Sequence, residues 1–346
     1  MRILVMGAGA IGGNVGAPLA RAGLDLTLID QWPAHVEAMK AGGLRVSGTA
    51  GDYVQPVRAL HLHEAQSLDQ PFEAVFLAVK GYDTEWATMF AQRFLGPEGV
   101  VVDFQNGIND QRVAAVAGRE RTLGCVITIG AGLYEPGHVV RTDIGGGFKI
   151  GELDGRDSER ARRLVEAVGH AAPTTLTTNL FGERWSKLAV NCMANPLAGL
   201  SGYGTSEVRA LELPRRIAIQ VGAEVIRVGR AAGHEVEPVM GIAARRIVDA
   251  AEGRGLAAVE AEMIEASRKS QGGQPSLLQD VMRGRRTEVD ELNGFVVAEG
   301  RRLGVPTPFN QAVVREIHRH GVGRLVPDPK NLEPLAAMLP TPLAAR

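Results

Sequence analysis

Short runs of β-branched and aliphatic residues alternate with helix-periodic stretches through the first half of the chain. The apolar runs predict five strands, at Arg2 to Met6, Asp25 to Asp30, Ala74 to Val79, Val100 to Gln105 and Thr122 to Ile129. Apolar residues at helical spacing predict helices between several of them, near Ile11 to Ala22, Ala34 to Ala41 and Thr84 to Phe94. Repeated strand–helix alternation indicates an α/β domain with a doubly wound parallel sheet.

Two glycine-rich segments interrupt this alternation. Residues 44–62 and 130–152 alternate polar and apolar positions in the manner of antiparallel hairpins. We therefore expect a mixed sheet edge in these two places.

After about residue 178 the pattern becomes helical. One helix is expected to start near Pro214 and to stop at Gly233, and Ser276 with Gln279 fits a capping box that opens another. Thr307 before Pro308 is typical of an N-cap followed by a first-turn proline. The predicted organisation is an α/β domain over 1–178, an all-helical domain over 179–325, and a proline-containing surface tail over 326–346.

Composition narrows the class of protein. The chain has 346 residues, of which 45% are hydrophobic, and this fits about two globular domains. Its 38 Lys and Arg balance 39 Asp and Glu, so no basic excess points to nucleic acid. No secretory segment and no apolar run long enough to cross a bilayer is visible, so we expect a cytoplasmic protein without a membrane partner.

A glycine loop follows the first predicted strand. Its residues are Gly7, Ala8, Gly9, Ala10, Ile11 and Gly12, in the pattern G-x-G-x-x-G. The first glycine permits a tight turn, the second lets backbone N–H groups approach a pyrophosphate, and the third lets the helix pack against the sheet. With a strand before it and a helix after it, the loop predicts a dinucleotide site rather than a structural turn.

Asp30, at the end of the second strand, indicates which dinucleotide binds. A carboxylate there can accept hydrogen bonds from ribose hydroxyls and would repel a 2′-phosphate. No Arg or Lys follows until Lys40. NAD(H) is therefore favoured, with NADP(H) as the alternative; Asp30 could instead simply cap the next helix.

A polar stripe marks the start of the helical half. Lys187, Asn191 and Asn195 are spaced i, i+4, i+8 among apolar residues, so one helix face carries all three. Buried polar groups need partners, and a cleft with a polar, anionic ligand would supply them. Spacing alone leaves open a solvent-facing stripe. Glu288, behind Thr287, is by itself most simply a first-turn helix acid.

These motifs occur together in an order that resembles one family. The glycine loop, Lys80, Gln105-Asn106-Gly107, the stripe on Lys187, Ser276 and Thr287-Glu288 resemble the ketopantoate reductases (2-dehydropantoate 2-reductases) over about residues 1 to 320. The resemblance implies a Rossmann domain followed by a helical domain like that of 6-phosphogluconate dehydrogenase. It also implies an active site in the cleft between the two domains.

The resemblance further implies a role for each matching residue. Lys187 would be the general acid that protonates the carbonyl oxygen, and a lysine with a pKa lowered by desolvation suits this role. Glu288 would fix the lysine and the substrate hydroxyl groups. Substrate ligands would be Asn106, Asn191, Asn195 and Ser276. Lys80 and Asn106 would lie beside the nicotinamide and the substrate. No metal is expected, because His61 and His63 lack ligands at suitable spacing.

One departure from the family concerns the cofactor. Ketopantoate reductases usually carry an arginine or another NADPH-selective residue after the second strand, where this chain has Asp30 followed by Gln31. The departure predicts a paralogue that interconverts a 2-keto acid and a 2-hydroxy acid with NAD(H), outside or inside pantothenate biosynthesis. The alternatives are an opine-type or other secondary-alcohol dehydrogenase and a non-catalytic redox sensor that binds the dinucleotide. A homodimer is expected.

Overall fold

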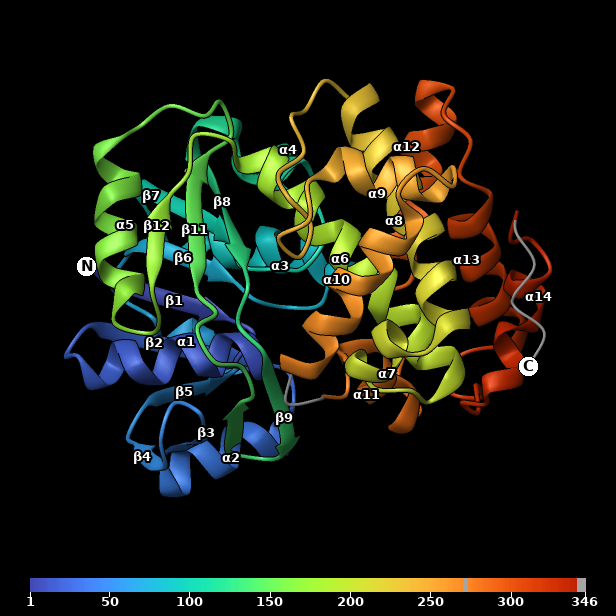
Figure 1. The fold of residues 1–346 in the computed structure, drawn as a ribbon. Helices are drawn as coiled ribbons and strands as arrows, with labels where there is room; N and C mark the ends of the chain where they lie inside the picture. Colours follow the sequence, from blue (N-terminus) through green and yellow to red (C-terminus); the bar gives the residue numbers. More distant parts are fainter. Residues whose placement is uncertain (270–272, 341–346) are drawn as a thin grey trace. The chain divides into compact units, whose positions relative to one another are not determined.

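The computed structural model describes residues 1–269 and 273–340. Contacts divide the chain into two compact units, Met1–Leu180 and Phe181–Arg346 (Figure 1). The division lies two residues beyond the boundary expected at 178. The last six residues of the expected tail, 341–346, lie outside the described part of the chain.

An eight-stranded sheet forms the centre of unit 1. Its spatial order is β12-β11-β8-β7-β6-β1-β2-β5. The strands are β1 (Arg2–Met6), β2 (Asp25–Asp30), β5 (Arg58–His61), β6 (Phe72–Leu77), β7 (Leu95–Asp103), β8 (Thr122–Ile127), β11 (Phe148–Glu152) and β12 (Thr174–Leu176). From β5 to β8 neighbouring strands are parallel, whereas β11 runs antiparallel to β8. The predicted doubly wound sheet is confirmed.

The strand order reverses beside β1. The chain moves outward from β1 to β2 and β5, then returns to place β6 on the other side of β1. Ligands of open α/β sheets bind at the carboxyl ends of the strands beside such a reversal. The glycine loop, which directly follows β1, stands at this point.

Helices connect the parallel strands. They are α1 (Ala10–Arg21), α2 (Pro33–Gly42), α3 (Thr84–Ala91), α4 (Asp110–Ala117) and α5 (Glu159–Gly169), with short 3-10 turns η1 (Leu62–Ser67), η2 (Gly81–Asp83), η3 (Gln92–Phe94) and η4 (Arg119–Arg121). Helix α1 continues through Pro18. Pro18 lacks an N–H group, so α1 loses one hydrogen bond to the carbonyl four residues earlier, but the helix does not end there.

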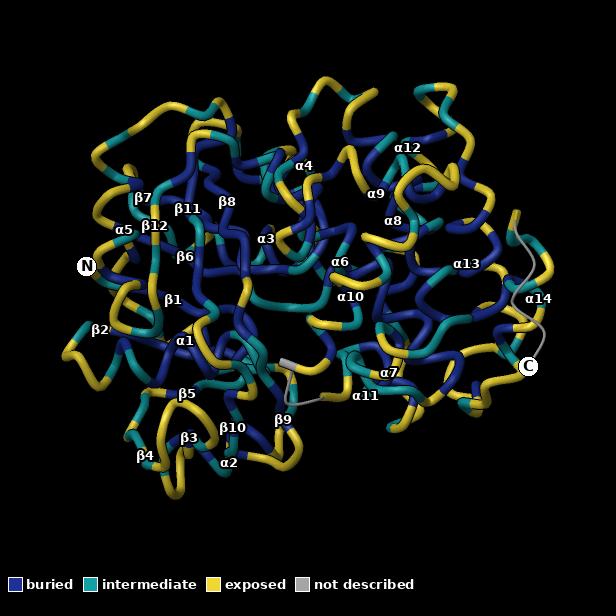
Figure 2. Tube along the Cα trace, in the orientation of Figure 1, coloured by how far each residue is buried: buried dark blue, intermediate teal, exposed yellow. Residues whose placement is uncertain are grey.

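Both faces of the sheet are buried. Ile3 and Val5 of β1 belong to one hydrophobic cluster, and Leu4 and Met6, which point the opposite way, belong to a second. The central strands accordingly appear almost wholly buried in Figure 2. Burial on both faces explains why these strands are continuous apolar runs in the sequence.

The expected mixed sheet edge is confirmed at β11, which lies in the second glycine-rich segment and runs antiparallel to β8. The two segments also build a second sheet that was not expected. Its order is β4-β3-β10-β9, and its strands are β3 (Leu44–Gly48), β4 (Tyr53–Gln55), β9 (Ala131–Glu135) and β10 (His138–Arg141). The pairs β3–β4 and β9–β10 are the antiparallel hairpins expected, but β3 and β10 join in parallel. Strands β5 and β11, from the same segments, join the main sheet instead.

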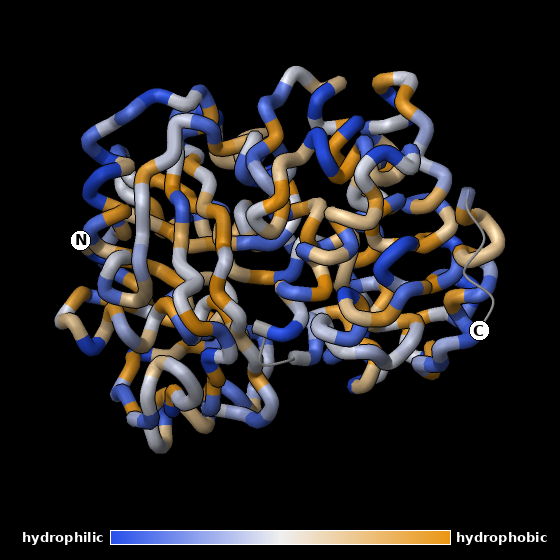
Figure 3. The backbone as a smooth tube through the Cα atoms, in the orientation of Figure 1, coloured by the Kyte–Doolittle hydropathy of each residue, from blue (hydrophilic) through white to orange (hydrophobic). Residues whose placement is uncertain are grey.

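Among the described residues of unit 2, the regular elements are helices, apart from one isolated bridge between Val239 and Ile242. Its helices are α6 (Leu180–Ser201, which begins at the unit boundary), α7 (Thr205–Ala210), α8 (Glu212–Ala231), α9 (Ala244–Ala251), α10 (Leu256–Lys269), α11 (Ser276–Met282), the π-helix η5 (Asp290–Gly294), α12 (Phe295–Leu303), α13 (Pro308–His320), η6 (Pro329–Leu332) and α14 (Glu333–Ala336). Hydrophobic and hydrophilic stretches alternate along them (Figure 3). An all-helical second domain is confirmed.

Of three local expectations in unit 2, two were wrong and one is confirmed. Helix α11 begins at Ser276, but Pro275 occupies the N-cap, so no capping box forms. Thr307 is the N-cap of α13 and Pro308 stands in its first turn, as predicted. The side chain of Thr307 makes no capping bond; the buried carboxylate of Glu224 on α8 accepts from the N–H groups of Phe309 and Asn310, at 2.8 and 2.9 Å. The expected surface tail contains α14, whose Leu335 is fully buried.

Candidate functional site

The three glycines of the loop meet different requirements. Gly7 has φ +94°, and a Cβ there would lie 2.9 Å from the backbone of Ala78, so only glycine fits beside the start of the β6 loop. A Cβ on Gly12 would collide with the carbonyl of Gly7. A Cβ on Gly9 would meet nothing within 4 Å. Packing within the protein thus explains Gly7 and Gly12, whereas Gly9 leaves backbone open to a ligand.

The same loop ends in a helix N-terminus. The first intrahelical bond of α1 runs from the N–H of Gly13 to the carbonyl of Gly9, at 2.8 Å. The N–H groups of Ala10, Ile11 and Gly12 precede it and have no partner within the helix. Open backbone at Gly9 beside these N–H groups fits the pyrophosphate of a dinucleotide.

Asp30 holds the loop from the neighbouring strand. Its carboxylate accepts from the N–H of Ala8 and from the N–H of Trp32, each at 2.8 Å. The alternative that Asp30 caps the next helix is wrong, because the N-cap of α2 is Trp32 and no side chain caps that helix. A carboxylate has about four acceptor positions, so these two bonds leave capacity for ribose hydroxyls.

Gln105 ties the ends of two central strands together. Its side-chain amide donates to the carbonyl of Val79 at 3.1 Å and to the hydroxyl of Thr84 at 3.0 Å. This links the loop after β7, which carries Asn106, to the loop after β6, which carries half-buried Lys80. The motif containing Gln105 predicts no role for this residue, although an amide at the end of an apolar run is a signal that the sequence offers.

The polar stripe of unit 2 lies on α6, as predicted. Asn191 and Asn195 are buried and Lys187 is half-buried, so the stripe does not face open solvent. Glycines of α8 let that helix approach closely: a Cβ on Gly222 would lie 2.5 Å from the sulfur of Met193 on α6. Buried asparagines on a closely packed helix are held in fixed positions.

Packing also brings the segments with Ser276 and Glu288 to α6. A Cβ on Gly199 of α6 would collide with Leu277, which directly follows Ser276 in α11. At the other end of α6, the ring of Trp185 lies 5.7 Å from that of Phe295, which follows η5. Glu288 is buried just before η5. Besides Lys187, unit 2 holds four candidate residues. Asn191 and Asn195 lie on α6, and Ser276 and Glu288 belong to segments that pack against α6.

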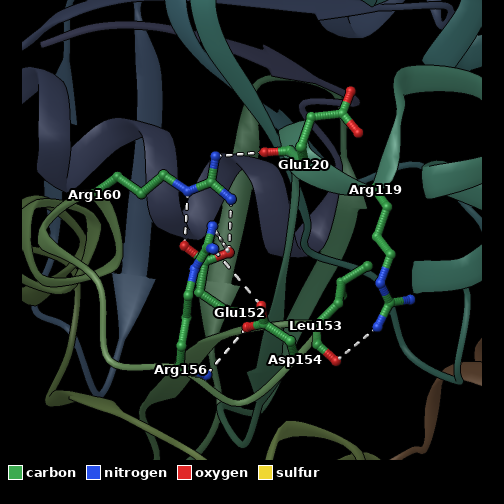
Figure 4. A pocket seen from close by; sticks show the side chains of 7 residues that line it. All are labelled: Arg119, Glu120, Glu152, Leu153, Asp154, Arg156 and Arg160. Atoms are coloured by element: carbon green, nitrogen blue, oxygen red, sulfur yellow. Dashed lines mark hydrogen bonds and ion pairs between the residues drawn. The ribbon is translucent and has the colours of Figure 1, made fainter.

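Unit 1 also contains a separate pocket, which does not have the features of a dinucleotide site. It encloses about 240 Å³ and is lined by Arg119, Glu120, Glu152, Leu153, Asp154, Arg156 and Arg160 (Figure 4). Three arginines face three carboxylates, and Arg160 contacts Glu152 twice at 2.7 Å. The charges balance within the pocket, so it favours neither an anion nor a cation.

Within residues 1–269 and 273–340 no group of three or more His, Cys, Asp or Glu could hold a metal ion. No helix in the same residues is long and apolar enough to cross a membrane.

The fold and the glycine loop define the class: a dinucleotide-binding α/β unit joined to a helical unit with half-buried Lys187 and two buried asparagines along one helix. Comparison of the sequence with family models identifies the family within that class. The model "Ketopantoate reductase PanE/ApbA" matches residues 3–155, and its C-terminal counterpart matches residues 179–321. The chain belongs to the ketopantoate reductase family, and it is an NAD(P)-dependent oxidoreductase that acts on a CH–OH or keto group. The resemblance stated from the motifs is confirmed.

Curated relatives agree over nearly the whole chain. The 2-dehydropantoate 2-reductase of Archaeoglobus fulgidus is 32% identical over 316 residues, which cover 90% of this chain and 95% of the relative. The enzyme of the same name from Mesorhizobium japonicum is 31% identical and covers 94% and 99%.

Solved structures share the fold. The 2-dehydropantoate 2-reductase of Geobacter metallireducens is 27% identical with a TM-score of 0.78, covering 91% of this chain and 98% of that one. D-mandelate dehydrogenase in complex with NADH and anilino(oxo)acetate has a TM-score of 0.80 at 21% identity, over 92% and 97%. The second likeness supports the fold alone.

Proposed function

We propose that the protein interconverts a 2-keto acid and a 2-hydroxy acid with NAD(H), by chemistry like that of 2-dehydropantoate 2-reductase. One observation carries the cofactor choice: a carboxylate, Asp30, ends β2 beside the loop at the strand-order reversal. The next cation along the chain, Lys40, already bonds both carboxylate oxygens of Glu64, at 2.6 and 2.7 Å. A 2′-phosphate would therefore meet negative charge without a dedicated cation from this segment.

Residues of both units serve the reaction in this proposal. The N–H groups of residues 9–12 hold the pyrophosphate, Asp30 accepts from the ribose hydroxyls, and Lys80 and Asn106 lie beside the nicotinamide ring. Asn106, Asn191, Asn195 and Ser276 bind the substrate's polar groups. Nicotinamide, when bound, supplies or accepts the hydride.

Lys187 and Glu288 handle the proton. In reduction, the ammonium of Lys187 donates a proton to the substrate carbonyl oxygen, and its charge stabilises the developing alkoxide. Glu288, a buried carboxylate, orients that ammonium and accepts from a substrate hydroxyl. In oxidation the neutral amine takes the hydroxyl proton back. A cytoplasmic location and a homodimer remain predictions.

Steady-state kinetics with both cofactors test this proposal. Ketopantoate is the first substrate to measure, followed by a panel of 2-keto and 2-hydroxy acids. We expect kcat/KM with NADH to exceed that with NADPH by about tenfold or more, a difference of roughly 1.4 kcal/mol. A clear preference for NADPH would contradict the cofactor assignment while leaving the reaction class intact.

Other activities are not favoured by family membership. An opine dehydrogenase would form a new C–N bond from a keto acid and an amine, and product analysis would reveal it. A redox sensor would need no proton donor, whereas this chain holds a lysine and a carboxylate at the family's positions, Lys187 and Glu288.

A further inference from the structure

A buried histidine contacts the glycine loop from behind. His35, in the first turn of α2, has no solvent exposure. Its Nδ1 accepts from the N–H of Gly137 at 2.8 Å, so Nδ1 carries no proton. In the neutral ring the proton is then on Nε2, which lies 2.9 Å from the carbonyl oxygen of Ala8 and donates to it.

Both backbone groups of Ala8 are therefore held by side chains. Asp30 accepts from its N–H and His35 donates to its carbonyl. In a trans peptide the C=O and the following N–H point in opposite directions. The bond from His35 thus turns the N–H of Gly9 away from the protein interior, at the residue whose Cβ side is open.

The histidine is itself fixed. Gly137, at the turn between β9 and β10, has φ +74°, and a Cβ there would lie 2.8 Å from the Cβ of Ala38 on α2. The ring of His35 also stacks on Trp32, with centroids 5.8 Å apart. A ring held by a hairpin turn, an indole and a carbonyl has little freedom to release the loop.

We propose that His35 is a positioning residue for dinucleotide binding: it fixes the Ala8–Gly9 peptide so that the Gly9 N–H faces the pyrophosphate. The inference rests on the proposed dinucleotide site. The positioning role belongs to Nε2 alone, because Nδ1 bonds to Gly137 in the hairpin turn and does not contact the glycine loop.

Two substitutions test the roles of Nδ1 and Nε2 of His35 separately. In His35→Gln the side-chain amide reaches the position of Nε2 and can still donate to Ala8, but the bond to Gly137 is lost. In His35→Asn the side-chain oxygen occupies the position of Nδ1 and keeps the bond to Gly137, but nothing reaches Ala8. Each variant loses one buried hydrogen bond, so the two make a matched pair for stability.

Direct titration of each folded protein with NADH and with NADPH, by nucleotide fluorescence, is the test. We expect His35→Asn to bind the preferred dinucleotide at least tenfold more weakly than wild type and His35→Gln to bind it within threefold. In kinetics, the KM for dinucleotide should rise in His35→Asn while kcat and the KM for the keto acid stay within twofold.

Equal affinities in the two variants, or a tenfold loss in His35→Gln, would overturn the inference. Should His35→Asn fail to fold, as judged by thermal melting, the affinity of His35→Gln decides the question by the same threshold. Failure of the wild-type protein to bind either dinucleotide would instead overturn the proposed function, so the two failures are distinguishable.

Discussion

The carboxylate of Asp30 has two roles in this account. Its bonds to the N–H groups of Ala8 and Trp32 shape the loop. In the proposed function its charge also selects the nucleotide that the loop accepts. A residue that served only the first task could be replaced by another acceptor. Selection against a 2′-phosphate needs the negative charge itself.

Asp30→Asn tests the second task. The charge disappears while one acceptor oxygen remains, so we expect the ratio of kcat/KM for NADH to kcat/KM for NADPH to fall at least tenfold. Both dinucleotides bind the same loop, so damage to the loop would lower both kcat/KM values and would cancel in their ratio. The control is Asp25→Asn at the exposed start of the same strand, where Asp25 pairs with Arg2 at 3.3 Å. An unchanged ratio in Asp30→Asn would count against charge selection.

At single positions, prediction from sequence succeeded where the requirement is local. Gly7 has a positive φ within its own turn, and a Cβ on Gly12 would collide with the carbonyl of Gly7, so the motif identifies both. Glu224 and His35 act on backbone that is far away in sequence: Glu224 caps α13 from 85 residues before Phe309, and His35 holds Ala8 across 27 residues. No local pattern around either residue indicates such a partner, so only the fold reveals the role.

Elements were predicted best where a strand is buried on both faces. The bounds of β1 and β2 agree with the expected ones, whereas β7 begins at Leu95 and ends at Asp103 rather than spanning Val100 to Gln105. Apolar character continues past the strand because Phe104 packs on Phe76, with ring centroids 4.6 Å apart. Alternation identified the hairpin strands but not the parallel pairing of β3 with β10, which depends on distant contacts.

The junction of β11 and α5 depends on one carboxylate. Glu152 ends β11 and accepts from the hydroxyl of Ser158, the N-cap of α5, at 2.6 Å and from Arg160 within α5. Burial alone would raise the pKa of Glu152, but the hydrogen bonds from Arg160 and Ser158 outweigh it, and the pKa is lowered. A lowered pKa means that the folded state favours the carboxylate.

Glu152→Gln should therefore destabilise the protein in a pH-dependent way. We expect a loss of about 2 kcal/mol at pH 7, because hydrogen bonds to a buried charge are removed. The stabilisation is present above the unfolded pKa of a glutamate, 4.5, and disappears as the pH falls through the lower folded pKa. Urea unfolding of wild type and variant should thus differ at pH 7 and converge in acid.

Glu166→Gln, at an exposed position of α5, is the control for that measurement and should change stability by less than about 0.5 kcal/mol. A constant difference between wild type and Glu152→Gln from pH 7 into acid would contradict the proposed linkage.

At the scale of the whole molecule, the order of motifs along the chain carried the most information. The glycine loop alone predicts a dinucleotide site, and the stripe on α6 alone left a solvent-facing helix open. Their occurrence in one order indicated the ketopantoate reductase family, which the matches to residues 3–155 and 179–321 confirm. Such motifs do not identify the substrate, because they do not specify the side chains that contact the rest of the substrate molecule.

The central claim is that the amine of Lys187 moves the proton of the reaction. Lys187→Cys removes the amine, and 2-bromoethylamine then rebuilds it as a thioether analogue of lysine. The native thiols, Cys125 and Cys192, are both buried, so the reagent should leave wild-type activity unchanged. Thermal melting of the variant serves as the folding check.

The decisive measurement is kcat of Lys187→Cys before and after this alkylation, with dinucleotide affinity measured in parallel. The account predicts a loss of about 10² or more in kcat, unchanged dinucleotide binding, and recovery of at least a tenth of wild-type kcat once the amine is restored. A folded variant that keeps near-wild-type kcat, or one that alkylation does not revive, would contradict the account.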